Sequence, residues 1–170
     1  MKPYSIFSFS LYNHNRARDI CDIFKQYGTH AYSYMICTST GETIKHGLSN
    51  DNEYKNGTWG NRIYKQLLGA PGWDYRPYNG DTSAIEFSEL MQEHYPALDK
   101  NDLSVTVWDF GSTDFLKKSK RTQDLLLEMV EQDFLIIYKE KHGKLPVGNI
   151  QAQRNRSHMK TYNNLIHELP

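Results

Sequence analysis

The stretch AYSYMICTSTGETIKHGLS occupies residues 31–49 and decides the expected fold. Residues 31–38 are rich in aromatic and apolar side chains, the turn-forming run STGE follows at 39–42, and a second short segment covers residues 43–48. Two such segments joined by a short turn that contains glycine are typical of a β-hairpin. We therefore expect a hairpin here, with the other elements arranged around it.

Apolar periodicity predicts helices on both sides of this hairpin and one further strand. The run LSVTVWDF at 103–110 alternates and is rich in β-branched residues, which favours a strand. The polar stretch 50–57 and the aromatic stretch 73–80 are expected to be loops. The predicted helices are 15–27, followed by Gly28; 59–68, with Thr58 as its cap; 83–93; and 119–141, closed by Gly143 and Pro146. The expected fold class is α+β, with a small antiparallel sheet of about three strands flanked by helices.

Composition narrows the class of protein. The 170 residues suit one domain, and 20 basic against 20 acidic side chains give zero net charge, which excludes a strongly basic nucleic-acid binder but leaves room for a local basic surface. No apolar run approaches the roughly 18 residues that span a membrane. Cys21 and Cys37 fit neither a metal-binding spacing nor a disulfide framework, so we expect small core residues and a reducing, cytoplasmic compartment.

The candidate chemistry begins in the hairpin. Tyr34 and Lys45 lie symmetrically about its turn, and residues placed so can face each other about 5 Å apart on one side of the sheet. An ammonium group beside a phenol stabilises the phenolate. Arg62 follows on the next predicted helix. Each residue alone is also compatible with an ordinary role, Tyr34 as a packed aromatic side chain and the two cations as solvated surface groups.

Glu131 is the fourth candidate residue. It lies well inside the longest predicted helix, and its neighbours at three and four residues' spacing are largely apolar. A carboxylate on such a face needs a metal ion or an ion pair. A lysine such as Lys139 or Lys117 is the structural alternative. A tyrosine, a lysine, an arginine and one carboxylate are components of phosphoryl chemistry.

The order of these residues resembles the GIY-YIG nuclease family. The matching runs are Tyr32-Ser33-Tyr34-Met35-Ile36, the Gly41 turn, Lys45-His46-Gly47, Asn61-Arg62, the strand LSVTVWDF, Glu131, and finally Pro146 and Asn149. The resemblance covers roughly residues 31–150, and the layout is most similar to small restriction endonucleases of that family. Neither tripeptide of the family is intact. The first reads Tyr32-Ser33-Tyr34, and in the second, Lys45-His46-Gly47, lysine replaces the second family tyrosine. A further departure is Gln66, where many members have His or Tyr.

The resemblance implies a Mg²⁺- or Mn²⁺-dependent endonuclease that hydrolyses duplex DNA. Tyr34 would activate water with help from Lys45, Arg62 would stabilise the pentacovalent phosphorus, and Glu131 would bind the metal ion. Tyr32 takes the place of Tyr34 if the strand register slips by two residues. Restriction is the first choice of biological role, ahead of homing, phage DNA processing or repair, and a homodimer on DNA is expected. The alternative is a nucleic-acid-binding or partner-binding module that has kept the fold and lost activity.

Three regions follow from this interpretation. Residues 1–28 are expected to be an N-terminal helical extension, 29–150 the catalytic domain and 151–170 a basic C-terminal segment. Within and before that segment, the expected nucleic-acid contacts are Asn149, Arg154, Arg156 and Lys160. A solvated chain end explains the basic segment nearly as well. The loop that begins at Trp73 is expected either to stack on DNA or to cover the core, and His46 and His142 are expected to be structural or surface residues.

Overall fold

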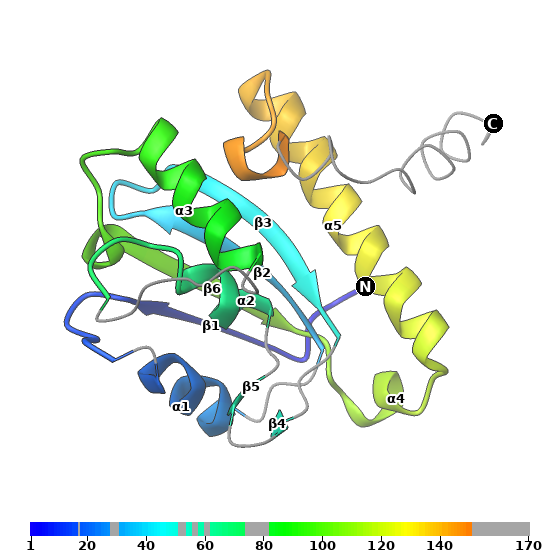
Figure 1. The fold of residues 1–170 in the computed structure, drawn as a ribbon. Coiled ribbons are helices and arrows are strands. Elements are labelled where there is room, and N and C mark those ends of the chain that lie inside the picture. Colours follow the sequence, from blue (N-terminus) through cyan, green and yellow to red (C-terminus); the bar gives the residue numbers. More distant parts are fainter. Residues whose placement is uncertain are drawn as a thin grey trace.

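The computed structural model has a four-stranded antiparallel sheet at its centre (Figure 1). It describes residues 1–16, 18–27, 31–50, 54–55, 58–59, 62–73 and 82–150. The strands are β1 (Ser5–Ser10), β2 (Tyr32–Thr38), β3 (Thr43–Ser49) and β6 (Leu103–Asp109), in the spatial order β1-β6-β2-β3. The expected hairpin is confirmed as β2 and β3, and the expected strand as β6. The α+β class is therefore confirmed, with helices packed against an antiparallel sheet.

The sheet has one strand more than the three expected, because the N-terminal segment adds β1. This strand pairs with β6 from Ser5 opposite Asp109 to Ser10 opposite Ser104. Serine alternates with apolar residues in β1, and Phe7 is its one buried side chain. An edge strand needs few apolar residues, which is why the pattern was too weak to predict it. Residues 1–28 are thus not a purely helical extension.

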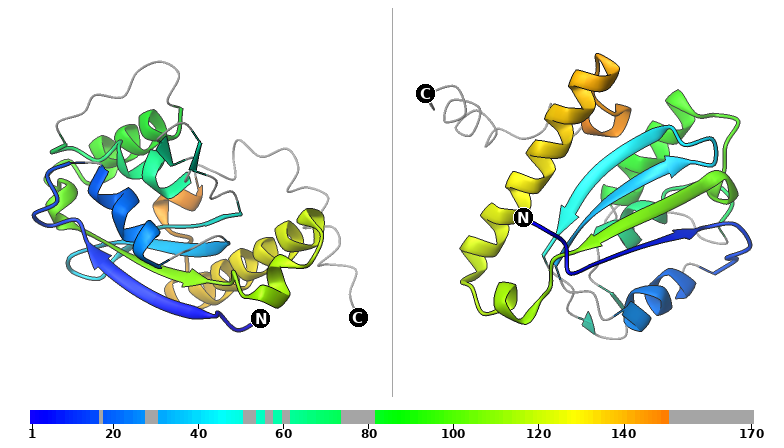
Figure 2. Two further views of the ribbon diagram at one scale, coloured as in Figure 1. Left: turned by 90° about the horizontal axis from the view of Figure 1, so that it is seen from below. Right: turned by 180° about the vertical axis from the view of Figure 1, so that it is seen from behind.

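Three helices cover one face of the sheet and form the main core (Figure 2). They are α1 (Arg18–Tyr27), α2 (Arg62–Leu67) and α3 (Thr82–His94). Paired residues of antiparallel strands share a face, so Tyr34 and Ile36 of β2 lie on this face beside Val107 and Val105 of β6. The helices contribute Ile20, Cys21, Ile63, Leu67, Phe87, Leu90 and Met91 to the same core.

The long helix α5 (Lys120–His142) runs beside β3 and packs on the opposite face of the hairpin (Figures 1 and 2). Ser119 caps its first turn, and Gly143 ends it with a left-handed φ of 73°. The helix expected over 119–141 is therefore confirmed. His46 of β3 stacks on Phe134 of α5 with ring centroids 3.9 Å apart. This stack fixes the helix against the hairpin.

The remaining elements are close to expectation except near α2. The predicted helices over 15–27 and 83–93 are confirmed as α1 and α3, although α1 begins later, at Arg18. Thr58–Trp59 forms strand β5, which pairs with β4 (Tyr54–Lys55), so a small strand pair replaces part of the expected loop and delays the start of α2. The 3-10 helix η1 (Lys100–Asp102) and helix α4 (Thr113–Leu116) were not predicted. No helix in the described ranges combines the length and the apolar character needed to cross a membrane.

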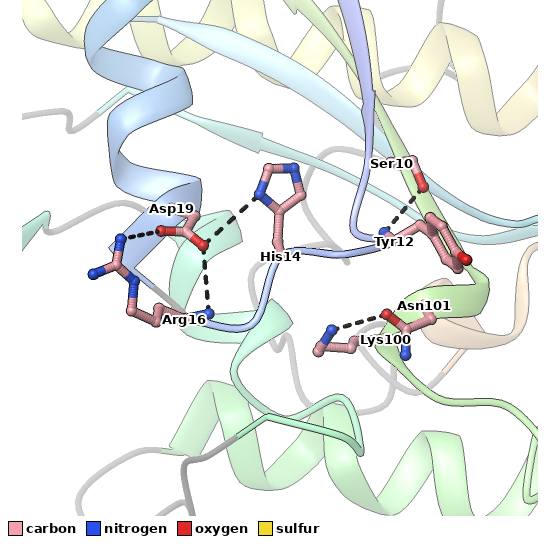
Figure 3. A network of polar contacts seen from close by, with 7 residues as sticks. All are labelled: Ser10, Tyr12, His14, Arg16, Asp19, Lys100 and Asn101. Carbon is pink, nitrogen blue, oxygen red and sulfur yellow. Dashed lines mark hydrogen bonds and ion pairs between the residues drawn. The ribbon is translucent and has the colours of Figure 1, made fainter.

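The connection from β1 to α1 is ordered by Asp19 (Figure 3). Its carboxylate accepts hydrogen bonds from the backbone N–H of Arg16 at 3.4 Å and from the Arg16 guanidinium at 3.3 Å, and the His14 ring lies 3.9 Å away. Earlier in the turn, the Ser10 hydroxyl accepts a hydrogen bond from the backbone N–H of Tyr12. A carboxylate in the first turn of a helix is favoured by the helix dipole, so Asp19 stabilises both the turn and the start of α1.

The chain after α5 returns to the free edge of β3. The side-chain oxygen of Asn149 accepts a hydrogen bond from the backbone N–H of His46 at 2.8 Å, and its nitrogen donates one to the His46 carbonyl at 2.8 Å. This amide presents the donor and acceptor that a neighbouring strand would supply, so it covers the edge strand at that residue. At Gly148 a Cβ would lie 2.9 Å from the Cβ of Lys45, so only glycine allows this approach.

The buried His46 gives a first prediction. Burial lowers the pKa of His46 from 6.5 to about 3. Below pH 6.5 the His46 side chain binds a proton in the unfolded chain but not in the folded chain. The contribution of neutral His46 to the free energy of unfolding is therefore complete above pH 6.5 and is lost as the pH falls toward 3. We expect a loss of about 1.4 kcal/mol per pH unit below 6.5, or roughly 2 kcal/mol at pH 5. Urea unfolding between pH 7.5 and 5 measures it. His46→Phe should remove this part of the pH dependence, and equal pH profiles for the two proteins would contradict the assignment.

The Asn149 contact gives a second prediction. Asn149→Ala leaves the backbone N–H and carbonyl of His46 without their partners, at a cost of about 1–3 kcal/mol for each buried group. Asn50→Ala is the control, because the Asn50 side chain donates a hydrogen bond to the part-exposed side chain of Asp124. Its cost should stay below about 1 kcal/mol. Unfolding free energies from urea titration compare the two variants, and an equal cost would show that Asn149 does not fix β3.

Candidate functional site

The phenol of Tyr34 is the point where three elements of the candidate site meet. It donates a hydrogen bond to Oε1 of Gln66 on α2 at 2.5 Å. It also lies against the backbone of Gly47 on β3, where a Cβ would come within 2.5 Å of the phenol oxygen. Only glycine at this position leaves room for the ring. Tyr34 is 0% exposed, so the side chain is completely buried where these elements meet.

Lys45 shares a face of the hairpin with Tyr34 but does not lie directly opposite it. Tyr34 pairs with Gly47, and Lys45 pairs with Ile36, so the expected face is right and the expected pairing is wrong. A Tyr34–Lys45 pair would centre the turn between Ser39 and Thr40, whereas the Cys37–Thr43 pair centres it on Thr40, and the register shifts again between Ile36 and Cys37. A shift of one residue moves a side chain to the other face. This bulge therefore places Lys45 on the Tyr34 side, where Gly148 lies against its stem.

The register pairs neither tyrosine of β2 with Lys45. Tyr34 pairs with Gly47 and Tyr32 with Ser49, and the choice of Tyr34 as the catalytic tyrosine stays a prediction. Both tyrosines are fully buried on the core face. Tyr34 is the one that reaches the backbone of Gly47 and the side chain of Gln66.

Arg62 is the first residue of α2, one helical turn before Gln66. Arg62 therefore lies on the helix after the hairpin, as predicted, although that helix begins at Arg62 and not near Trp59. The side chain of Arg62 lies outside the part of the chain that the structure describes. The contribution of its guanidinium to the site stays a prediction.

Glu131 lies in the middle of α5 and is 4% exposed. Leu127 and Leu135, one turn before and after it, are also buried. The expectation of a carboxylate on an apolar helix face is confirmed. α5 packs on the face of β3 opposite to Tyr34, Lys45 and Gly47, so the structure places the helix that holds this acid on the other side of the hairpin from these residues. A buried carboxylate of this kind requires a cation or hydrogen-bond donors.

The donor set around this carboxylate limits the metal ions that suit it. In the described ranges no three His, Cys, Asp or Glu side chains gather closely enough to hold a metal ion by themselves. Zinc in a structural site usually needs four such protein ligands. Mg²⁺ commonly uses one or two carboxylates together with water and substrate phosphate oxygens, so Glu131 fits that ion better.

Of the four predicted nucleic-acid contacts, the structure describes only Asn149. Asn149 is 3% exposed, and both polar atoms of its amide bind the backbone of His46, so the prediction that it contacts nucleic acid is wrong. Its role is to position β3 and thereby Lys45. Arg154, Arg156 and Lys160 lie outside the described residues, and their predicted contacts are untested.

Two other predicted features are resolved in part. Trp73 is buried, its indole N–H donates to the Leu67 carbonyl at 2.7 Å, and the Lys100 ammonium lies 5.0 Å from its ring centroid. It covers the core, whereas residues 74–80 of the same stretch are outside the described part. The prediction of free, buried cysteines is confirmed for Cys21 and Cys37.

Two residues of the site were not predicted as members. Gln66 could have been found from its spacing, because it occupies the position after Arg62 where many GIY-YIG nucleases have His or Tyr. Gly148 gave no such signal. Its importance comes from a close approach to β3, which lies about a hundred residues earlier in the chain.

Comparison of the chain with protein-family models, with curated proteins and with solved structures found no match. The resemblance to GIY-YIG nucleases therefore depends on the order of residues in the sequence, and it stays a prediction.

Proposed function

We propose that this protein is a Mg²⁺-dependent DNA endonuclease of the GIY-YIG type. The main support is the contact of Tyr34 with both Gly47 and Gln66. These three residues come from the first tripeptide, the second tripeptide and the helix position that follows the essential arginine. Tyr34 and Gly47 were matched to the family from sequence order alone, whereas Gln66 departs from the His or Tyr found in many members, and the meeting of the three at one hydroxyl group is a geometric property that the match did not require.

In the proposed reaction, Tyr34 takes a proton from the attacking water molecule. Lys45 lies diagonally across the hairpin on the same face, where its positive charge favours the phenolate form. Arg62 stabilises the negative charge that develops on the phosphate oxygens. The water oxygen forms a bond to phosphorus while the bond from phosphorus to the 3′ oxygen breaks, which leaves a 5′-phosphate.

Glu131 would hold the divalent ion, Mg²⁺ or Mn²⁺, together with water and phosphate oxygens. A bound ion of this kind supplies positive charge to the leaving 3′ oxygen. We propose a restriction-like role, in which a symmetric DNA site would favour a homodimer.

A second candidate function follows from the burial of the same residues. Tyr34 is 0% exposed and its hydroxyl is occupied by Gln66, and Glu131 is 4% exposed. A phosphodiester reaches these groups only when the segments that cover them move. If they do not move, the protein is a nucleic-acid-binding or partner-binding module that has kept the nuclease fold without its activity.

Cleavage of supercoiled plasmid in Mg²⁺ or Mn²⁺ distinguishes the two candidates. The endonuclease should nick or linearise plasmid, and Glu131→Gln should lower the rate at least about a hundredfold, because it removes the charge that holds the ion. Glu128→Gln is the matched control, since Glu128 is an exposed carboxylate on the same helix. It should keep the full rate. Binding of DNA without cleavage in either metal would instead support the inactive module.

The two tyrosines of β2 provide a separate test of the mechanism. Tyr34→Phe removes the hydroxyl group and should abolish cleavage, whereas Tyr32→Phe should keep most of the rate. Both positions are fully buried, so the two variants remove one hydroxyl group each from similar surroundings. Initial rates and thermal unfolding of both variants should be measured together. A stable Tyr34→Phe protein that cleaves at the normal rate would exclude Tyr34 as the general base.

A further inference from the structure

A pocket of about 630 Å³ lies on the other side of the hairpin from the Tyr34 site. One wall comes from the hairpin, where Met35, Glu42 and Thr43 line it beside Gly41. The other wall comes from the last turns of α5 and the residue that follows Gly143: Phe134, Ile137, Tyr138, Lys141, His142 and Lys144. The size falls within the range of roughly 300–1,000 Å³ typical of small-molecule sites.

The α5 wall is a row of aromatic rings. Phe134 and Tyr138 have ring centroids 5.9 Å apart, and Tyr138 and His142 have centroids 4.2 Å apart with planes inclined by 29°. Phe134 is itself fixed by its stack on His46. Ile137 is 63% exposed and extends the apolar surface next to these rings. Rings held in this way offer a planar partner a rigid surface at little entropic cost.

The rim of the pocket has an excess of positive charge. Lys141 and Lys144 are exposed, and no ion pair joins either of them to a carboxylate in the described part of the chain. The one carboxylate of the pocket belongs to Glu42, which accepts a hydrogen bond from the Tyr95 hydroxyl at 2.9 Å. Burial raises the pKa of Tyr138, so its phenol stays neutral and does not repel an anion. Two lysines beside an apolar, aromatic wall suit a ligand that has both a planar ring and a negative group.

We propose that this pocket binds a nucleotide, with the base against Ile137 and Tyr138 and the phosphate between Lys141 and Lys144. The chemistry is the same for a free mononucleotide and for one nucleotide of a single strand. The proposal does not depend on the proposed nuclease function, because Met35 and Thr43 line the pocket on the face of the hairpin opposite to Tyr34 and Lys45.

Binding of four probes to the full chain tests the proposal: deoxyadenosine monophosphate, deoxyadenosine, inorganic phosphate and a fluorescent twelve-nucleotide single strand. Titration calorimetry suits the first three and fluorescence anisotropy suits the strand. The expected result is tighter binding of the mononucleotide than of the nucleoside or of phosphate, because only the nucleotide uses both parts of the pocket. If only the single strand binds, and the variants described in the next paragraph change its binding as expected there, the natural source of the bound nucleotide is a single strand. Equal binding of nucleotide and phosphate, or binding of none of the probes, would overturn the proposal.

Two pairs of variants place the binding in this pocket. Lys141→Ala/Lys144→Ala should weaken nucleotide binding at least about tenfold, whereas Lys117→Ala/Lys118→Ala makes the same change of charge on exposed residues after α4 and should leave it unchanged. Ile137→Glu should likewise abolish binding. Ile136→Glu adds the same charge at the adjacent position, which is 44% exposed and outside the pocket, and should not. Equal effects of the members of either pair would overturn the assignment.

Discussion

A large part of this protein is arranged around the two hydrogen bonds between Asn149 and the backbone of His46. They cover the free edge of β3 and bring Gly148 against Lys45, so the position of that lysine depends on a segment about a hundred residues later in the chain. They also hold His46 in register, and its ring is the surface on which Phe134 of α5 stacks. One buried amide therefore links the edge strand, the long helix and the segment that follows the helix.

β3 separates two different environments because its successive side chains point to opposite faces. Lys45 lies on the side of Tyr34, Gly47 and Gln66, where a phenol is enclosed by three elements. His46 lies on the side of α5, where burial keeps it neutral and no polar group of the described chain contacts its Nδ1. Neutral His46 is compatible with aromatic stacking, whereas a buried charge there would need a partner. The bulge in β3 produces this separation, because without it Lys45 would point toward α5.

The sequence was sufficient for local elements and insufficient for long-range contacts. The aromatic and apolar content of residues 31–38 and the turn at 39–42 predicted β2 and β3 within one residue at each end, and the helical period together with Gly143 predicted α5. The pairing of Lys45 was wrong by two residues, because the turn is centred later than that pairing requires and because a bulge adds a residue without a recognisable composition. Asn149 was assigned to DNA because its polarity suggests an exposed contact, and nothing local indicates that a strand edge is its partner. The same limit applies to Trp73, whose indole N–H finds a carbonyl group in α2.

The balance of charge explains why binding of an anion would have to be local. With 20 basic and 20 acidic side chains, the chain has no net charge to attract nucleic acid from a distance. Several of its cations are paired with nearby acids, as Arg16 is with Asp19 and Lys117 with Asp114. Lys141 lies instead in the last turn of α5, where the helix dipole stabilises positive charge without a carboxylate partner. A lysine that is stable without an acidic partner remains available to a phosphate group.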